Sequence, residues 1–209
     1  MNKIGIIFDL DGTLWNTIIP TYKAANDIAK ENNLKEVSIK KIINGMGKDK
    51  KYNASNYYPE VNLDIALNLL EQSSKKNSYY LKRKEAIIYP NVETTLQQLS
   101  QKYNLFIASN CFDDDYINTF KSYLNVDFKE AIAAGKLNMN KAEAIKYIIN
   151  KNNLHKAIYV GDTNLDYESA NEANIPFIYA KYGFGKINKY EYSISNIKEL
   201  INVITNIFK

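Results

Sequence analysis

Two aspartates one residue apart follow a short apolar run at the start of the chain. The run spans Ile4–Phe8, and Asp9 and Asp11 come directly after it. A run this short and this uniformly apolar predicts a strand that is buried on both faces. In open α/β sheets, ligands bind in the crevice beyond the carboxyl ends of the strands, so this position puts both carboxylates in a candidate site. Gly12 then turns the chain.

The alternation of Asp9 and Asp11 about Leu10 suits phosphoryl transfer. Leu10 is expected to point back into the protein, which lets both carboxylates address one point in the crevice. One of them can attack phosphorus and form an aspartyl phosphate. The other can protonate the leaving oxygen and afterwards take a proton from water. The alternative is a plain Asp-Gly turn after a strand, because turns favour both residue types.

A second pair of carboxylates follows a later apolar run. Residues 157–160 predict another buried strand, and the segment 161–166 reads Gly-Asp-Thr-Asn-Leu-Asp. The spacing allows Asp162 to stand at the strand tip and Asp166 to point back from the first turn of a helix. Together with Asp9 they can form the cluster of hard oxygen ligands that Mg²⁺ prefers.

One lysine has a position that suits anion binding. Asn140 and Glu143 have the spacing of a capping box, which places Lys141 in the first turn of a helix. The amino terminus of a helix, with a lysine beside it, is a good place to hold an anion. Lys136, which has only a loop context, is the alternative.

Acidic residues also gather just after the predicted strand over 105–108. Asp113, Asp114 and Asp115 precede Tyr-Ile, and they predict the solvated start of a helix. Cys111 is interpreted as a small residue beside the site. These residues are assigned no chemistry.

Four segments, taken in order, resemble the four motifs of the haloacid dehalogenase superfamily. Residues 8–14, Phe-Asp-Leu-Asp-Gly-Thr-Leu, are similar to the first motif in its phosphatase form. The strand that ends in Ser109 and Asn110 is similar to the second, Lys141 to the third, and residues 161–166 to the fourth. The resemblance covers nearly the whole chain and points to the phosphoglycolate phosphatase-like subclass.

The resemblance implies both a fold and a set of site residues. The fold is α/β, a doubly wound, Rossmann-like parallel sheet with a helical cap domain inserted after the first motif. Asp11 would bind the metal through its main-chain carbonyl, and Asp166 would be a ligand or would orient one. The implied residues are, for catalysis, Asp9, Asp11, Ser109 and Lys141; for substrate binding, Asn110, Lys48 and Gly12; and for Mg²⁺, Asp9, Asp11, Asp162 and Asp166.

The domain boundaries follow from the spacing of the predicted strands. About ninety residues separate the first strand from the next at 105–108, far more than one crossover helix requires. Apolar residues recur at helical spacing over 18–29, 39–43 and 65–70. We therefore expect a helical cap domain over 16–86 and an α/β catalytic core over 1–15 and 87–209.

A glycine-flanked loop interrupts the helical pattern of the predicted cap. Residues 44–62 predict a loop and a short helix, and Lys48 lies between the glycines and the following lysines. In related capped phosphatases the corresponding loop reaches over the active site. Lys48 is therefore a candidate for holding a second anionic group of the substrate, and the alternative is a solvated surface charge.

Composition limits the class of protein. The chain has 209 residues, of which 27 are basic and 23 acidic, and these charges are scattered, so we expect no nucleic-acid partner. Cys111 is the only cysteine, which excludes an intrachain disulfide. No apolar segment approaches the roughly 20 residues that span a bilayer, and the first strand begins at once, so we expect a cytoplasmic protein without a signal peptide.

The sequence as a whole predicts a Mg²⁺-dependent phosphatase that hydrolyses a small phosphorylated metabolite through an aspartyl-phosphate intermediate. A phosphomutase of the same superfamily is one alternative. A metal- or phosphate-binding regulatory module without turnover is another. Asn16-Thr17 and Lys141-Ala142 depart from the usual Asp-Ser and Lys-Pro of the superfamily, and the substrate and the oligomeric state stay open.

Overall fold

The computed structural model describes residues 3–208 and divides the chain into two compact units. One unit comprises Met1–Trp15 and Ile88–Lys209, and the other comprises Asn16–Ile87. Each unit has a hydrophobic core of its own. At the boundary, the short strands β2 (Trp15–Asn16) and β3 (Ile87–Ile88) form a two-stranded sheet.

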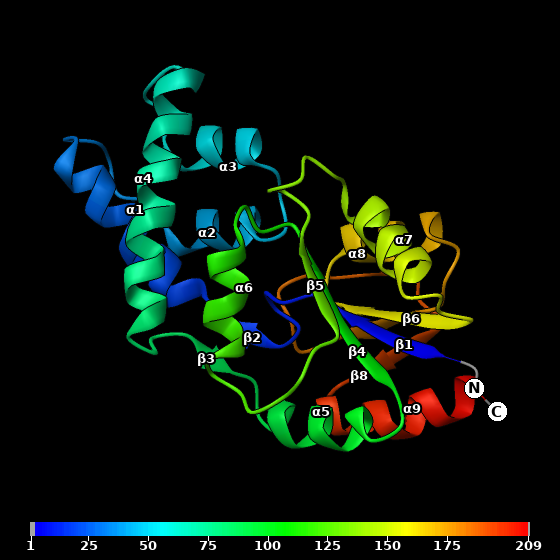
Figure 1. Ribbon diagram of the computed structural model, residues 1–209. Helices are drawn as coiled ribbons and strands as arrows, with labels where there is room; N and C mark the ends of the chain where they lie inside the picture. Colours follow the sequence, from blue (N-terminus) through cyan, green and yellow to red (C-terminus); the bar gives the residue numbers. More distant parts are fainter. Residues whose placement is uncertain (1–2, 209) are drawn as a thin grey trace. The chain divides into compact units, whose positions relative to one another are not determined.

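The first unit is built on a six-stranded parallel sheet with the order β5-β4-β1-β6-β7-β8 (Figure 1). The strands are β1 (Ile4–Phe8), β4 (Asn104–Ser109), β5 (Glu130–Ala133), β6 (Lys156–Gly161), β7 (Phe177–Ala180) and β8 (Tyr192–Ile194). The strand β1 lies in the middle, and its residues 6–8 are fully buried, as the uniformly apolar run predicts. The predicted doubly wound parallel sheet is confirmed.

Helices cover both faces of this sheet. Its helices are α5 (Val92–Ser100), α6 (Asp114–Lys121), α7 (Lys141–Lys151), α8 (Asn164–Glu172), the 3₁₀ turn η1 (Ile197–Glu199) and α9 (Leu200–Ile207). In Figure 1, α7 and α8 lie on one face, and α5 and α9 lie on the other. Under α7 and α8, the core is formed by buried side chains of β1, β4 and β6, among them Ile7, Phe106 and Tyr159.

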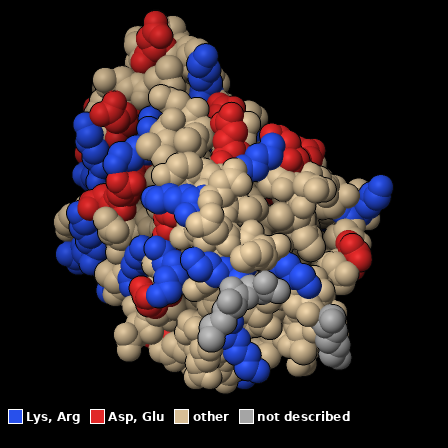
Figure 2. Space-filling view, turned by 45° about the vertical axis from the view of Figure 1, so that its right-hand side comes forward, with Lys and Arg blue, Asp and Glu red and all other residues tan. Residues whose placement is uncertain are grey.

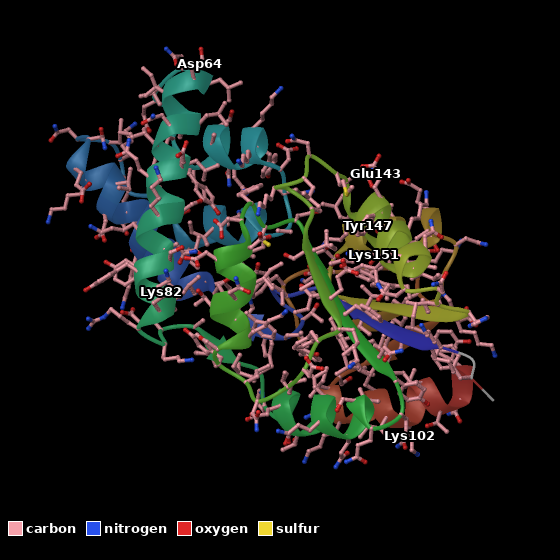
Figure 3. The ribbon with its side chains drawn as sticks, in the orientation of Figure 1. Asp64, Lys82, Lys102, Glu143, Tyr147 and Lys151 are labelled. Carbon is pink, nitrogen blue, oxygen red and sulfur yellow. The ribbon has the colours of Figure 1, made fainter. Side chains whose placement is uncertain are left out.

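The side chains of α7 determine which side of the helix faces the sheet. Glu143, Tyr147 and Lys151 are four residues apart, and they line its outer side in Figure 3. The side chains buried on its inner side are Ala144, Ile145 and Ile148. The predicted capping box is present, because Asn140 Oδ1 accepts from Glu143 N at 2.8 Å and Glu143 Oε2 accepts from Asn140 N at 2.7 Å. This cap fixes where α7 begins.

The second unit is helical. Its helices are α1 (Ile18–Glu31), α2 (Ile39–Gly45), α3 (Lys50–Tyr57) and α4 (Leu63–Lys82). Tyr58 is fully buried in its core, and its hydroxyl group donates to the carbonyl of Ala25 at 3.1 Å. Asp64 lies in the first turn of α4 and Lys82 in its last turn (Figure 3), the arrangement that the helix dipole favours.

The short strands are the elements that the sequence does not predict. β8 has three residues, of which only Ile194 is buried, and β2 and β3 have two residues each. Segments of this length show neither an apolar run nor a clear alternation. Their pairing therefore depends on the neighbouring strand rather than on a local pattern.

Surface charge is mixed. On the face shown in Figure 2, basic side chains lie beside acidic ones. Exposed pairs such as Lys23–Glu85 at 2.6 Å and Lys146–Glu172 at 3.2 Å each contribute at most about 1 kcal/mol. No helix in the described part of the chain combines the length and the apolar character that crossing a membrane requires.

We predict that Asn140→Ala lowers the free energy of unfolding by about 1 kcal/mol, because it removes the side chain that caps α7. Urea unfolding followed by circular dichroism measures the change. Asn150→Ala, at an exposed position of the same helix, is the matched control and should cause no loss. Equal losses in the two variants would show that the cap does not stabilise the start of α7.

Candidate active site

Four charged side chains from different elements meet beyond the carboxyl ends of β1 and β6. Asp9 follows β1, Asp162 follows β6, Lys141 begins α7, and Asp166 lies in the first turn of α8. All four are at most 5% exposed. The ammonium group of Lys141 lies 2.8 Å from Asp9 Oδ1 and 2.6 Å from Asp166 Oδ1. One oxygen from each of the three carboxylates lies within 4.8 Å of the others.

The register of the sheet brings Asp9 and Asp162 together. Phe8 lies opposite Val160 in the parallel pairing of β1 with β6. The backbone N–H of Asp9 then donates to the carbonyl of Val160 at 2.9 Å, one step beyond the last strand residue. Because neighbouring parallel strands end at the same edge, the two carboxylates are placed by backbone pairing before any side-chain contact forms.

The turn after β1 passes closely over Asp162. Gly12 has φ of +85°, and a Cβ atom there would lie 2.3 Å from Asp162 Oδ2. Glycine is therefore required both by the backbone conformation and by the space. Thr13 Oγ1, on the same turn, donates to Asp162 Oδ1 at 3.3 Å.

A loop after β7, which is not among the predicted site segments, supplies further donors to Asp162. The backbone N–H groups of Phe184 and Gly185 donate to Asp162 Oδ2 at 2.7 and 3.3 Å. A Cβ atom on Gly183 would lie 2.3 Å from Asp162 Cβ. The available signal was the Gly-Phe-Gly sequence shortly after an apolar strand, since such glycines mark a close approach of backbone to another group.

Asp166 is surrounded by donors on both oxygens. Oδ1 accepts from Lys141 and, at 3.4 Å, from the buried hydroxyl group of Tyr159. Oδ2 accepts from the backbone N–H groups of Asp162 and Thr163 and, at 2.6 Å, from Thr163 Oγ1. The Thr163–Asp166 pair is a second capping box, which the Thr-x-x-Asp spacing could have revealed. Nothing in the sequence singles out Tyr159, which reads as an ordinary core residue.

The charges of the cluster do not cancel, because three carboxylates share one ammonium group. Burial raises the pKa of Asp9 well above its usual range, with Asp166 and Asp162 adding to the effect against the opposing charge of Lys141. Burial, helped by Asp166, raises the pKa of Asp162 to about 7. An excess of buried carboxylate oxygen is the donor set that a hard divalent cation such as Mg²⁺ fits.

Lys141 and Asp166 form an ion pair whose charges cancel. Burial favours the uncharged form of each group, but their mutual attraction outweighs it. The pKa of Lys141 is raised by Asp166 and Asp9, and the pKa of Asp166 is lowered by Lys141. Both groups therefore stay ionised at neutral pH.

The other candidate residues of the first unit lie at the same edge of the sheet. Asp11 Oδ1 accepts from the hydroxyl group of Tyr116 at 2.7 Å. Ser109 is buried at the end of β4, directly before Asn110, and its Oγ accepts from the N–H of Cys111 at 3.3 Å.

The two alternatives for the phosphate-binding lysine have different surroundings. Lys136 is exposed and pairs with Asp114, whereas Lys141 is buried against Asp9. Lys48 belongs to the other unit, where its ammonium group lies 5.7 Å from the centre of the Tyr52 ring. Its contribution to substrate binding stays a prediction.

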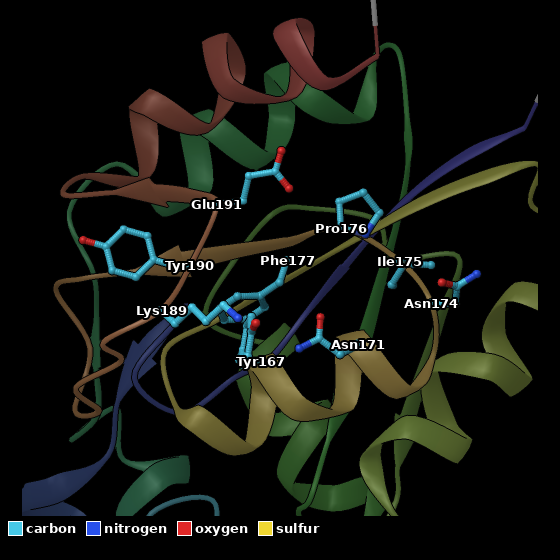
Figure 4. A pocket seen from close by; sticks show the side chains of 9 residues that line it. All are labelled: Tyr167, Asn171, Asn174, Ile175, Pro176, Phe177, Lys189, Tyr190 and Glu191. Atoms are coloured by element: carbon cyan, nitrogen blue, oxygen red, sulfur yellow. The ribbon is translucent and has the colours of Figure 1, made fainter.

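A separate cavity of about 660 Å³ opens on the first unit (Figure 4). Tyr167 and Asn171 of α8, Phe177 of β7 and the segment 189–191 before β8 line it. Pro176 and Phe177 lie at the amino-terminal end of β7, so the cavity is at the opposite edge of the sheet from the carboxylate cluster. None of the four clustered residues lines it.

A family model and several solved structures match the chain. A family model described as haloacid dehalogenase-like hydrolase matches residues 6–180. No curated protein matches the chain.

Several solved structures share the whole fold. A haloacid dehalogenase-like family hydrolase from Streptococcus pneumoniae has 23% identity and a TM-score of 0.84, over 97% of this chain and 98% of that one. A predicted phosphoglycolate phosphatase from Haemophilus somnus has 20% identity and a TM-score of 0.85, over 98% of both chains. A predicted phosphatase from Clostridium acetobutylicum has 21% identity and a TM-score of 0.82, over 99% and 100%. At these identities the likeness shows the fold alone.

We predict that Lys141→Met lowers the free energy of unfolding by about 3–5 kcal/mol near neutral pH, because it leaves two buried carboxylates without their cation. Without the ammonium group, burial raises the pKa of both carboxyl groups, so the folded state binds protons more readily than the unfolded state. The deficit relative to wild type should therefore shrink as the pH falls from about 7.5 to about 5.5.

Urea unfolding at the two pH values measures this difference. Lys136→Met is the matched control. Because it removes only an exposed pair with Asp114, it should lower the free energy of unfolding by less than about 1 kcal/mol at either pH. A deficit for Lys141→Met that is small, or independent of pH, would contradict the ion-pair interpretation.

Proposed function

The chain belongs to the haloacid dehalogenase-like hydrolase family, and from that premise we propose that it is a Mg²⁺-dependent phosphatase that hydrolyses a small phosphate monoester through an aspartyl phosphate. The observation that carries the proposal is the buried contact of Lys141 with Asp9, beside Asp162 and two residues before Asp11. The similar structures described as phosphatases support the same reaction class.

We assign Asp9 as the nucleophile. Its Oδ1 accepts from Lys141, which fixes the orientation of the carboxylate. In the first step, the bond from Asp9 to phosphorus forms while the bond from phosphorus to the leaving oxygen breaks. The fixed positive charge of Lys141 stabilises the negative charge on the transferring group.

Asp11 supplies the proton transfers. As the ester bond breaks, its carboxyl group gives a proton to the leaving oxygen. The resulting carboxylate then takes a proton from a water molecule, which attacks phosphorus and breaks the bond to Asp9. Inorganic phosphate and the original Asp9 carboxylate are the products.

Asp9, Asp162 and the main-chain carbonyl of Asp11 would hold the metal. A bound Mg²⁺ neutralises charge on the phosphoryl oxygens and on the carboxylates. Asp166 is less suited to direct coordination, because five donors from four residues already surround its oxygens. We therefore assign Asp166 to orienting Lys141.

The phosphoryl oxygens need further donors. The hydroxyl group of Ser109 and the backbone N–H groups near Asp11 and Asn110 lie at the carboxyl ends of β4 and β1 and are assigned to this contact. The proposed substrate is a small phosphorylated metabolite. A reducing, cytoplasmic compartment suits a chain with one cysteine.

The proposal is tested by a phosphate-release screen over phosphoglycolate, sugar phosphates and nucleotides, with Mg²⁺ or with EDTA. We predict release that requires Mg²⁺ and is lost in Asp9→Asn, because an amide cannot attack phosphorus although it has nearly the same volume. Circular dichroism checks that the variant is folded. Substantial release by Asp9→Asn in saturating Mg²⁺ would remove Asp9 as the nucleophile.

The same screen separates a phosphatase from the two alternatives, neither of which releases phosphate. A phosphomutase would move the phosphoryl group to another position of the substrate without releasing phosphate. A regulatory module would bind phosphate without turning over any ester.

We predict that Asp11→Asn lowers kcat by about 10²- to 10⁴-fold for alkyl phosphates and much less for nitrophenyl phosphate. Nitrophenolate leaves with little need of a proton, so loss of the acid affects it less. Steady-state kinetics with both substrates measure the two ratios. Equal losses would mean that Asp11 acts through position or metal binding rather than as an acid.

A further inference from the structure

We propose that Tyr116 is a positioning residue that orients the carboxyl group of Asp11 and assists its transfer of a proton to the leaving group. The inference rests on the proposed function and deepens it. Tyr116 Oη donates a hydrogen bond to Asp11 Oδ1 at 2.7 Å, and the two residues are 105 positions apart in the chain. No sequence motif points to Tyr116.

The acidic run before α6 places the backbone of Tyr116. Asp113 is the N-cap of α6, and its Oδ1 accepts from the N–H of Tyr116 at 2.7 Å. The thiol of Cys111 lies 3.7 Å from the carbonyl oxygen of Asp113, to which it donates. The start of this helix, which reads as an ordinary solvated helix end, therefore fixes a side chain that reaches the acid.

Trp15 places the ring of Tyr116. The two rings pack edge to face, with centroids 5.1 Å apart and an angle of 77° between their planes. Trp15 is fully buried, and Phe120 and Tyr123 pack against the same indole at 5.2 and 5.6 Å. Turning the Tyr116 ring away from Asp11 would give up this edge-to-face contact.

The segment 11–15 contains both Asp11 and Trp15, the residue against which Tyr116 packs. The backbone N–H of Gly12 donates to the carbonyl of Trp15 at 2.9 Å, which closes the turn that follows Asp11. Any shift of this turn would therefore move Asp11 and the indole together. The contact between Tyr116 and Asp11 is preserved by that linkage.

The hydrogen bond decides which oxygen of Asp11 carries the transferable proton. Because Oδ1 accepts from Tyr116, the proton of the acid form is on Oδ2. When that proton moves to the leaving oxygen, the bond from Tyr116 becomes a bond to a carboxylate, which is roughly twice as strong as a neutral one. Tyr116 keeps its own proton throughout. The residue thus favours proton donation and slightly disfavours the later return of a proton from water.

The contribution of Tyr116 to the rate should therefore depend on the leaving group. Esters of alcohols need protonation as the ester bond breaks, so they should lose rate when the hydroxyl group of Tyr116 is removed. Nitrophenyl phosphate, whose leaving group needs little protonation, should not. Only the gain in strength from the neutral to the charged hydrogen bond counts toward the rate, about 1–1.5 kcal/mol, which corresponds to roughly 5- to 10-fold.

The experiment compares Tyr116→Phe with wild type on an alkyl phosphate and on a series of aryl phosphates of rising leaving-group basicity. Tyr116→Phe keeps the ring against Trp15, and a thermal unfolding scan checks that the fold is retained. Tyr123→Phe is the matched control, because it removes a hydroxyl group from another ring on the same indole.

We expect Tyr116→Phe to lower kcat for the alkyl phosphate by roughly 5- to 10-fold, with KM unchanged, and to leave nitrophenyl phosphate nearly unaffected. The dependence of kcat/KM on leaving-group basicity should become steeper, and Tyr123→Phe should behave as wild type. Parallel losses on all substrates, or no loss on any, would overturn the inference. A wild-type protein without phosphate release would instead overturn the proposed function.

Discussion

The ammonium group of Lys141 is shared between Asp9 and Asp166, and the other contacts of the site are arranged around that three-way interaction. Burying a charge is costly unless it is paired and hydrogen-bonded. The protein meets this condition fully for Asp166, which accepts from side chains on both oxygens and from backbone N–H groups on Oδ2, and only partly for Asp9 and Asp162. The Asp9 and Asp162 carboxyl groups are therefore buried with less compensation than stability alone would favour, and such perturbed groups cluster at functional sites.

Strand pairing and helix starts place the charged groups of the site, and nearby loops add further contacts. The parallel pairing of β1 with β6 places Asp9 and Asp162, and the first turns of α7 and α8 place Lys141 and Asp166. Two glycine-containing turns, at Gly12 and Gly183, then close over the Asp162 carboxylate. Each group is held by an element whose own geometry is decided locally, so the site needs few long side chains to reach across open space.

Elements that are decided by a local sequence pattern could be predicted from the sequence. The uniform apolar runs before Asp9, Ser109 and Asp162 predicted buried strands, and the Asn140–Glu143 spacing predicted the start of α7. The catalytic and metal-binding roles of these residues are still predictions.

Other contacts have no local signal. The hydroxyl groups of Tyr159 and Tyr116 reach Asp166 and Asp11 only through the tertiary fold. In a chain with seventeen tyrosines, nothing marks these two. Short strands such as β8 are likewise decided by a neighbour rather than by their own three residues.

The large separation along the chain between the paired charges has a consequence for folding. Asp9 and Lys141 are 132 residues apart, and Thr13 and Asp162 are 149 apart. Contacts of such long range form only after loop closure has been compensated by other interactions. During synthesis, the amino-terminal aspartates leave the ribosome long before the lysine that neutralises them exists, and they stay hydrated until the sheet is complete. The cluster of buried charges is thus one of the last features to assemble, and a partly folded chain should lack the proposed activity.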